Sequence, residues 1–278
     1  MGKIIKKVEA IEFLGLSKKE FENYLKNSKE IIGQKIRGRW YFDMDFLNSY
    51  KKARSQRIIK LSVLEYERCF EFAIKMVYGG LSLSGIRGQR SEVQAADDVI
   101  LGILGEYAVK KFFKKQFDFE VELDNDVHTS YITPQDIIKV RDLKTRNLRI
   151  PKLGVGIKAS KLKSGFLVLG ANEVELANRK SDVYIFTRIG LHSDHLFRIL
   201  RDHSFFAKVT KFLNSHDDFR KIEPLFNVPI WICGYVYLSE LEKVNNIPGQ
   251  DFDGYRYVKS VADMHNKKED WEILINSL

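Results

Sequence analysis

The chain has 278 residues, 44% of them hydrophobic and 12% aromatic, which is enough for one large globular domain or two modest ones. No apolar run of about 18 residues or more occurs, and this argues against a membrane-spanning helix. Lysine and arginine outnumber aspartate and glutamate and give a net charge of +9. That excess favours a polyanionic partner such as nucleic acid.

Cys69 and Cys233 are the only cysteines, and each has apolar neighbours in the sequence. This pattern indicates two buried thiols in a reducing compartment and excludes a zinc site built on cysteines. The first seven residues contain no long apolar core and no small-residue cleavage site, so they do not have the pattern of a secretion signal. We therefore expect a cytoplasmic protein.

Two short helices are predicted near the N-terminus. Apolar residues at helical spacing predict the first over Lys7–Leu14, which Gly15 ends. The sequence Ser17-Lys18-Lys19-Glu20 has the pattern of a capping box that starts a second helix over Lys18–Lys26. We expect this second helix to bury Phe21 and Leu25 and to expose Lys18, Lys19, Glu22 and Asn23.

A basic hairpin and a third helix follow. Two short β runs lie on either side of Gly38, with Arg37 and Arg39 next to the glycine. Asp43 or Asp45 then caps a helix that contains Phe46, Leu47 and Tyr50. The order helix, turn, helix, hairpin, helix is typical of a winged helix-turn-helix domain.

The segment Lys3–Arg54 resembles the excisionase and MerR-like DNA-binding domains. In that family a short helix pair is followed by a wing with a Gly-Arg-Trp-aromatic signature, which corresponds here to Gly38-Arg39-Trp40-Tyr41-Phe42. The resemblance implies that the second helix lies in the major groove, and that the wing meets the DNA backbone. The DNA contacts would be Lys18, Lys19, Asn23, Arg37 and Arg39. The alternative is a small helical domain with a solvated basic hairpin.

A long helix over Ala95–Phe117 and several strands are predicted in the rest of the chain. Glu106 lies beside the apolar stripe of that helix, where a carboxylate is either solvated or leans towards a sheet. Strand patterns occur at residues 119–123, 136–140, 154–160, 165–169, 182–187 and 230–236. This succession predicts an α/β fold with a mixed (α+β) sheet.

One acid and one lysine fall on neighbouring predicted strands. Asp136 follows Pro134-Gln135 at the start of one strand, and Lys158 lies between Ile157 and Ala159 on the next. Such a pair can hold a divalent metal beside a scissile phosphate and stabilise the charge that develops there. Each residue also has a purely structural interpretation, as a strand-end aspartate and an edge-strand lysine.

Together with Glu106, this pair resembles the PD-(D/E)xK nuclease superfamily, especially restriction endonucleases, over residues 97–186. The resemblance implies a helix-flanked sheet, Mg²⁺ and hydrolysis of a phosphodiester by an activated water. Asp136 would be the bridging metal ligand, Glu106 an auxiliary ligand, and Lys158 the group that orients the water and stabilises the developing charge. Lys161 and Lys163 would add contacts to DNA phosphates.

The sequence departs from the superfamily pattern at Gly156, where an acid is normal two residues before the lysine. Either another carboxylate has taken over this role or the site is inactive. Glu173 and Glu175 follow the lysine strand closely, and we favour Glu173 as the catalytic and metal-binding replacement; both also fit as solvated loop acids. His192 and His195 have no third ligand at a suitable spacing and are expected on the surface or in a loop.

The C-terminal segment predicts a helix start at Ser239–Glu242, a loop from Ile247 to Tyr255 and a short helix over Asp270–Leu274. Arg256 is expected in strand packing, with a DNA contact as the alternative. We divide the chain into a winged helix-turn-helix domain (1–54), a helical connector (55–90) and a nuclease-like catalytic domain (91–278). In the connector, Arg87 and Arg90 belong to a glycine-arginine loop that either approaches a phosphate or is a surface turn.

The leading hypothesis is a sequence-specific, Mg²⁺-dependent endonuclease of the type II restriction class that cleaves double-stranded DNA. A homodimer is expected because cleaving both strands needs two active sites. The alternative, which Gly156 favours, is a non-catalytic DNA-binding regulator with a degenerate nuclease fold. A repair or junction-resolving nuclease is a third option.

Overall fold

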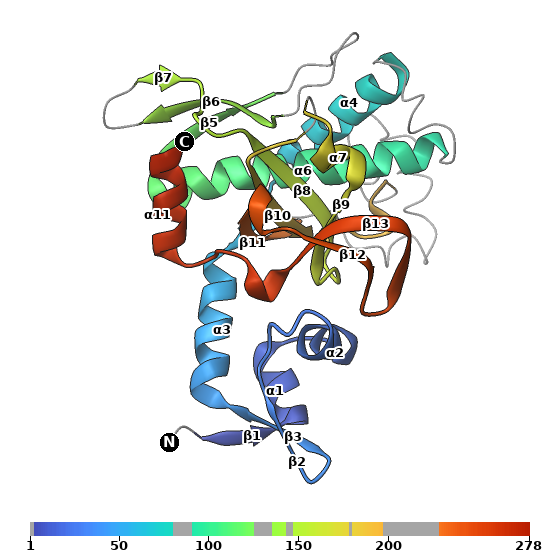
Figure 1. Cartoon of the computed structure of the whole chain (residues 1–278), viewed down its shortest axis with the longest axis vertical. Helices are drawn as coiled ribbons and strands as arrows, with labels where there is room; N and C mark the ends of the chain where they lie inside the picture. Colours follow the sequence, from blue (N-terminus) through green and yellow to red (C-terminus); the bar gives the residue numbers. More distant parts are fainter. Residues whose placement is uncertain (1–2, 80–90, 125–134, 143–146, 178–179, 197–227) are drawn as a thin grey trace, which may run out of the picture.

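The computed structural model describes residues 3–79, 91–124, 135–142, 147–177, 180–196 and 228–278. Within these ranges the chain combines α-helices with one mixed and three antiparallel sheets. Figure 1 shows the larger part of the chain above and a smaller N-terminal unit below, joined by the long helix α3. The predicted combination of helices with a mixed sheet is confirmed.

The central sheet has four strands in the order β4-β11-β10-β8. Strands β8 and β10 run parallel, whereas β10 with β11 and β11 with β4 are antiparallel. The strands β4, β8, β10 and β11 span Ile58–Lys60, Val155–Lys161, Val183–Ile189 and Pro229–Tyr237. Three of these strands agree with the sequence pattern; β4 does not.

Strand β4 corrects the expectation of a purely helical connector over 55–90. Helix α3 (Met44–Gln56) ends before it, and α4 (Val63–Gly79) begins after it. The β-branched pair in Ile58–Lys60 hydrogen-bonds to β11 at the edge of the sheet. Pairing with a distant strand thus gives this segment a β conformation, although its local sequence pattern is helical.

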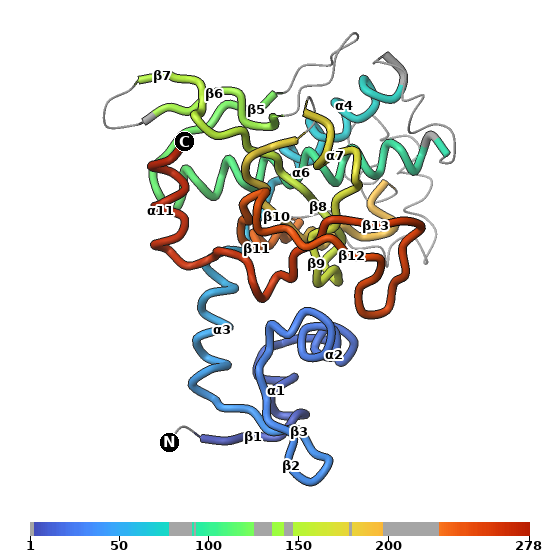
Figure 2. Tube along the Cα trace, viewed as in Figure 1, coloured from blue at the N-terminus to red at the C-terminus, as the bar shows by residue number. Residues whose placement is uncertain are grey.

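One face of the central sheet is covered by helices. Val183, Ile185 and Ile189 of β10 belong to a buried cluster that includes side chains from the three helices. These helices are α4, α6 (Glu92–Phe117) and α11 (Lys268–Ser277). Figure 2 shows α6 running behind the sheet and α11 standing at its side, next to the C-terminus.

The opposite face of the sheet packs against the N-terminal unit. Tyr184 and Phe186 alternate with the helix-facing residues of β10, and they share a second cluster with Phe21, Tyr24 and Trp231. One contiguous cluster of buried apolar side chains normally belongs to a single folding domain. The N-terminal unit is therefore docked on the sheet through a common apolar core.

Two three-stranded antiparallel sheets flank the centre. The first has the order β5-β6-β7, formed by Phe119–Leu123, Ile137–Asp142 and Leu148–Arg149. The second has the order β12-β13-β9, formed by Glu242–Ile247, Gln250–Ser260 and Phe166–Gly170. The hairpin β12–β13 corrects the expected helix start and loop: a single 3-10 turn forms at Leu238–Glu240, and the turn at Gly249 has φ 85°. Pairing of β13 with β9 satisfies the backbone of this polar segment.

The N-terminal unit follows the predicted order of elements. Helices α1 (Lys7–Leu14) and α2 (Lys18–Lys26) precede the hairpin of β2 (Gln34–Ile36) and β3 (Arg39–Asp43). The capping box at Ser17 is confirmed, and Asp43 caps α3. An additional strand β1 (Ile4–Lys6) pairs with β3.

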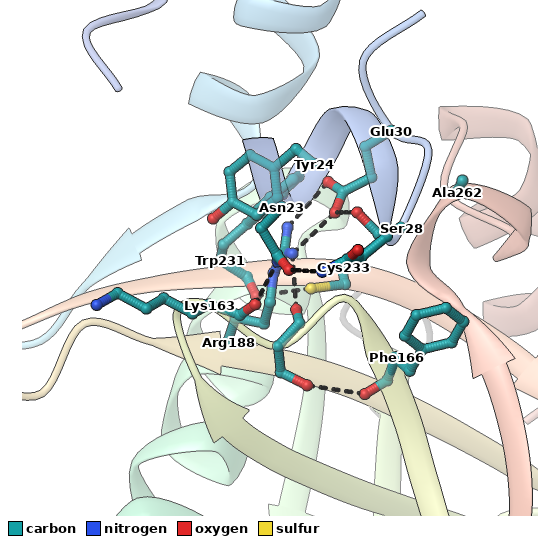
Figure 3. A network of polar contacts seen from close by, with 12 residues as sticks. Asn23, Tyr24, Ser28, Glu30, Lys163, Phe166, Arg188, Trp231, Cys233 and Ala262 are labelled. Atoms are coloured by element: carbon teal, nitrogen blue, oxygen red, sulfur yellow. Dashed lines mark hydrogen bonds and ion pairs between the residues drawn. The ribbon is translucent and has the colours of Figure 1, made fainter. Parts of the chain in front are cut away.

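A buried ion pair joins the N-terminal unit to strand β10. Arg188 is fully buried and makes two bonds to the Glu30 carboxylate, at 2.8 and 2.9 Å. Its Nη1 also donates to the carbonyl of Ser164 at 2.8 Å, and the guanidinium lies 3.8 Å from the ring centroid of Trp231. Figure 3 shows these contacts between the α2–β2 segment and the sheet. In the described part of the chain, no helix has the length and apolarity needed to cross a membrane.

Candidate functional site

Asp136 is fixed between the β5-β6-β7 sheet and the central sheet. Its N–H donates to the carbonyl of Val155 at 3.0 Å, and its carboxylate accepts a hydrogen bond from the N–H of Ile157. Both partners lie on β8, the strand that carries Lys158. The predicted acid, which directly precedes β6, and the predicted lysine, in the middle of β8, are thus brought together although their strands belong to different sheets. Pro134 lies outside the described residues.

Glu106 reaches the same place from helix α6. The preceding residue is Gly105, and a Cβ there would lie 2.6 Å from Thr187 Oγ1 and 3.1 Å from the Ala159 side chain. Only a glycine therefore lets α6 approach β8 and β10 this closely. The close approach brings the half-buried Glu106 carboxylate into the electrostatic field of Asp136.

Lys158 is paired with an acid from the short helix that follows strand β9. Its Nζ lies 3.2 Å from Oε2 of Glu173, on the short helix α7 (Ala171–Glu175). Burial opposes the charged form of Lys158, but the carboxylates of Glu173 and Asp136 outweigh it, so that its pKa is raised. The lysine is a fixed positive charge within a group of acids.

The missing acid at Gly156 has a structural cause. A Cβ at this position would lie 2.8 Å from Ser181 Oγ and 3.0 Å from the ring of Tyr184, its partner on β10. The Tyr184 hydroxyl accepts from the N–H of Ser181 at 3.0 Å and donates to the carbonyl of Glu173 at 3.3 Å. The ring that fills the space beside Gly156 therefore also holds the backbone of α7.

The two replacement candidates have different surroundings. Glu173 faces Lys158, whereas Glu175 accepts hydrogen bonds from the hydroxyls of Tyr255 and Tyr257 and pairs with Lys243. Of the two, the geometry therefore brings Glu173 to the site. Glu175 anchors α7 to the β12–β13 hairpin.

Burial and neighbouring carboxylates raise the pKa of two acids of the cluster, Glu106 and Asp136. Burial, followed by the charges of Asp136 and Asp124, raises the pKa of Glu106 well above its ordinary value. Burial also raises the pKa of Asp136 to about 6; Asp124 and Glu173 add to this, and the Ile157 N–H and Lys158 oppose it. Several acids with one lysine leave excess negative charge, which a cation would neutralise.

Asp124 is a member of the cluster that sequence reasoning missed. It follows β5 directly, and its N–H donates to the carbonyl of Asp136 at 3.2 Å. Strand β5 lies antiparallel to β6, which Asp136 precedes. The sequence did contain a signal for it. Asp124 directly follows one predicted strand, and Asp136 opens the next.

The donor chemistry of the cluster fits a hard divalent cation such as Mg²⁺, because all of its acidic groups offer carboxylate oxygens. Across the described ranges, no three His, Cys, Asp or Glu side chains are arranged as a ready metal-binding group. Glu173 lies against Lys158, and two of the other acids have raised pKa values. Neutralisation by a cation would lower those pKa values and favour the ionised, ligating forms.

The predicted DNA-contacting residues fall into three groups. Those exposed to solvent are Lys18, Lys19, Arg37, Arg39, Lys161 and Lys163. Arg37 and Gly38 form the tip of the β2–β3 hairpin, both with positive φ. Arg87 and Arg90 lie outside the described residues. Asn23 forms the third group by itself.

Asn23 has a different environment from the one expected. Its amide donates to the carbonyl of Lys163 in the β8–β9 turn, and the Tyr24 hydroxyl donates to the neighbouring carbonyl of Leu162 at 3.0 Å. This side of α2 therefore contacts the rest of the chain (Figure 3). Lys18 and Lys19, at the start of α2, remain on the surface.

The expectation that His195 is a surface or loop residue is wrong. Its ring is buried and contacts the hydroxyl of Tyr66, and its Nε2 lies 2.5 Å from Oδ1 of Asp97. Burial lowers its pKa to about 4. The partners come from α4 and α6, far away in the sequence, so local composition did not reveal them. His192 is exposed, as expected.

Comparison with models of known protein families found no match, and neither did comparisons with curated proteins and with solved structures.

Proposed function

We propose that the chain is a divalent-metal-dependent endonuclease that hydrolyses phosphodiester bonds in double-stranded DNA. The observation that carries the proposal is that Asp136 and the Lys158–Glu173 pair lie along the edge strand β8 of the central sheet, with Glu106 within electrostatic reach of Asp136. These groups come from a helix, two sheets and a short helix that are distant in the sequence. A purely structural role accounts poorly for two acids, Glu106 and Asp136, whose pKa values burial and neighbouring carboxylates raise at one place.

Each residue has a role that its position supports. Asp136 and Glu106 would hold Mg²⁺, which would supply positive charge next to the scissile phosphate. Lys158 would orient the attacking water and stabilise the negative charge that develops on the phosphate oxygens. Glu173 would hold Lys158 in place and take the role of the acid that is missing at Gly156.

The proposed DNA binding rests on the N-terminal unit and on the charge of the chain. The helix-turn-helix order, the exposed arginines at the hairpin tip and the charge of +9 support a winged, sequence-reading N-terminal unit. Cleavage of both strands at a fixed sequence would require two copies of the chain, and thus a homodimer. Restriction of duplex DNA in the cytoplasm is the biological setting that we propose.

The test is cleavage of mixed-sequence duplex DNA by the purified protein, with and without Mg²⁺. We expect cleavage that EDTA abolishes and that Asp136→Asn reduces by about 100-fold or more, as expected for loss of a major electrostatic contribution. Lys139→Gln is a suitable control, because Lys139 is an exposed cation on the strand that Asp136 precedes. Absence of cleavage by the wild type at every protein concentration would contradict the proposed endonuclease activity.

A second candidate is a DNA-binding regulator that keeps a nuclease-like fold without the chemistry. Two observations favour it: Gly156 leaves no space for an acid, and Lys158 neutralises Glu173. This candidate predicts DNA binding that depends on salt and is indifferent to EDTA. The cleavage assay and a binding assay with chelator separate the two candidates.

A further inference from the structure

The β12–β13 hairpin borders the candidate site. Strand β13 pairs with β9, and Arg256 lies opposite Gly170, the residue that directly precedes α7. Figure 1 shows the hairpin crossing the same side of the molecule as α7 and β9. The sequence predicted a loop from Ile247 to Tyr255, followed by Arg256 in strand packing or in contact with DNA, and the function proposed above assigns the hairpin no role.

A surface hollow joins the hairpin to the acidic cluster. It is lined by Gly170, Ala171, Asn172, Glu173 and Arg256. Glu173 is the residue that pairs with Lys158. The hollow is therefore an open surface that reaches the candidate site, with a guanidinium on one side of it.

Main-chain acceptors hold the Arg256 guanidinium. Its Nη1 donates to the carbonyls of Asp253 at 3.2 Å and Tyr255 at 2.9 Å. Among the described residues no carboxylate lies within ion-pair distance of it. Its position is thus fixed by neutral groups, and its charge is left for an external anion.

The hairpin also contains a cation in the opposite situation. Lys243 Nζ lies 3.5 Å from Oε1 of Glu175 and 3.5 Å from the ring centroid of Tyr255. Glu175 in turn accepts hydrogen bonds from Tyr255 and Tyr257, at 2.9 Å each. These contacts attach α7 to the hairpin. They also pair Lys243 with an acid of the same chain.

We propose that Arg256 binds a backbone phosphate of the nucleic-acid strand that passes over Glu173 and Lys158. The inference rests on the proposed function, and it identifies a substrate contact contributed by the C-terminal hairpin. A guanidinium suits this task because its fork of N–H donors matches the oxygens of a phosphodiester. Lys243, which is neutralised by Glu175, provides a matched control on the neighbouring strand.

The test measures the binding of a fluorescein-labelled, mixed-sequence duplex at several salt concentrations in the presence of EDTA, so that no cleavage occurs. We expect Arg256→Gln to weaken binding about three- to tenfold and to reduce the slope of log affinity against log salt by about 1, the value for one lost phosphate contact. Arg256→Lys should keep the slope and recover part of the affinity. Lys243→Gln should leave the slope unchanged.

The possible outcomes separate this inference from the function on which it rests. Arg256→Gln with the wild-type slope and affinity would overturn the Arg256 contact, while metal-dependent cleavage by the wild type would leave the endonuclease proposal intact. An equal decrease of the salt slope in Lys243→Gln and in Arg256→Gln would also overturn the contact. It would show that the slope depends on the net charge of the protein and not on a specific contact of Arg256. Wild-type protein that does not bind duplex DNA would overturn both proposals. Urea unfolding of each variant checks that the hairpin remains folded.

Discussion

The ring of Tyr184 stands directly beside Gly156 in the parallel β8–β10 ladder, and a Cβ on residue 156 would lie 3.0 Å from it. Restoring an acid at this position should therefore fail. We expect Gly156→Asp to lower the free energy of unfolding by about 1–3 kcal/mol through overpacking, with no gain in cleavage. Urea denaturation measures the loss. Gly102→Ala is the control, since a Cβ there meets no atom within 4 Å; wild-type stability in Gly156→Asp would contradict the steric account.

The Tyr184 hydroxyl is the direct link between β10 and the Glu173 backbone. Tyr184→Phe keeps the ring beside Gly156 and removes the hydroxyl, and with it both this link and the acceptor of the Ser181 N–H. We expect a loss of about 1 kcal/mol in unfolding free energy and a higher Mg²⁺ concentration for half-maximal cleavage, because Glu173 is less well positioned. Tyr41→Phe, on strand β3 of the N-terminal unit, is the control. An unchanged Mg²⁺ dependence would show that Tyr184 has only a packing role.

Asp136 should make stability depend on pH. Its pKa is raised to about 6 in the folded chain, whereas an aspartate in the unfolded chain titrates near 4. The stabilising effect of its bound proton is therefore complete below pH 4 and is lost as the pH rises through about 6. We expect Asp136→Asn to be more stable than the wild type at pH 8, by about 1–3 kcal/mol, and to match it near pH 4.

The same titration should respond to Mg²⁺. At pH 8 we expect added Mg²⁺ to raise the thermal midpoint of the wild type and to leave that of Asp136→Asn nearly unchanged, because the ion binds the folded, ionised cluster. Differential scanning fluorimetry with Mg²⁺ and with an equal ionic strength of NaCl measures this difference. A midpoint shift that is the same in both proteins would argue against a metal site at Asp136.

The sequence predicted local elements well and long-range partners less well. The capping box at Ser17 and the hairpin at Gly38 depend on neighbouring residues, and both formed as expected. Strand β4 and the β12–β13 hairpin depend on partners about 170 and 90 residues away along the chain, and they were not predicted. The same division holds for the site. Asp136 and Lys158 stand out by their place on strands, whereas Asp124 is recognised only when β5 is known to lie beside β6.

The Glu30–Arg188 pair should be a major source of stability between the N-terminal unit and the sheet. Glu30→Gln leaves the fully buried guanidinium without a counter-charge, and we expect a loss of about 3–5 kcal/mol in the free energy of unfolding. Glu22→Gln, which removes the partly exposed partner of Lys26, should cost less than about 1 kcal/mol. Urea unfolding followed by tryptophan fluorescence measures both, and equal small losses would contradict the account.

The position of β4 limits how the N-terminal unit can be exchanged. Helix α3 leads from that unit into β4 within two residues, and β4 pairs with β11 from the opposite half of the chain. A chimera cut at residue 54 would retain β4 and lose the buried partner of Arg188, so a transplanted reading unit would have to bring its own acid to the Glu30 position. Under the proposed function, new DNA specificity would therefore be more accessible through point changes at the hairpin tip and at the start of α2 than through exchange of the whole N-terminal unit.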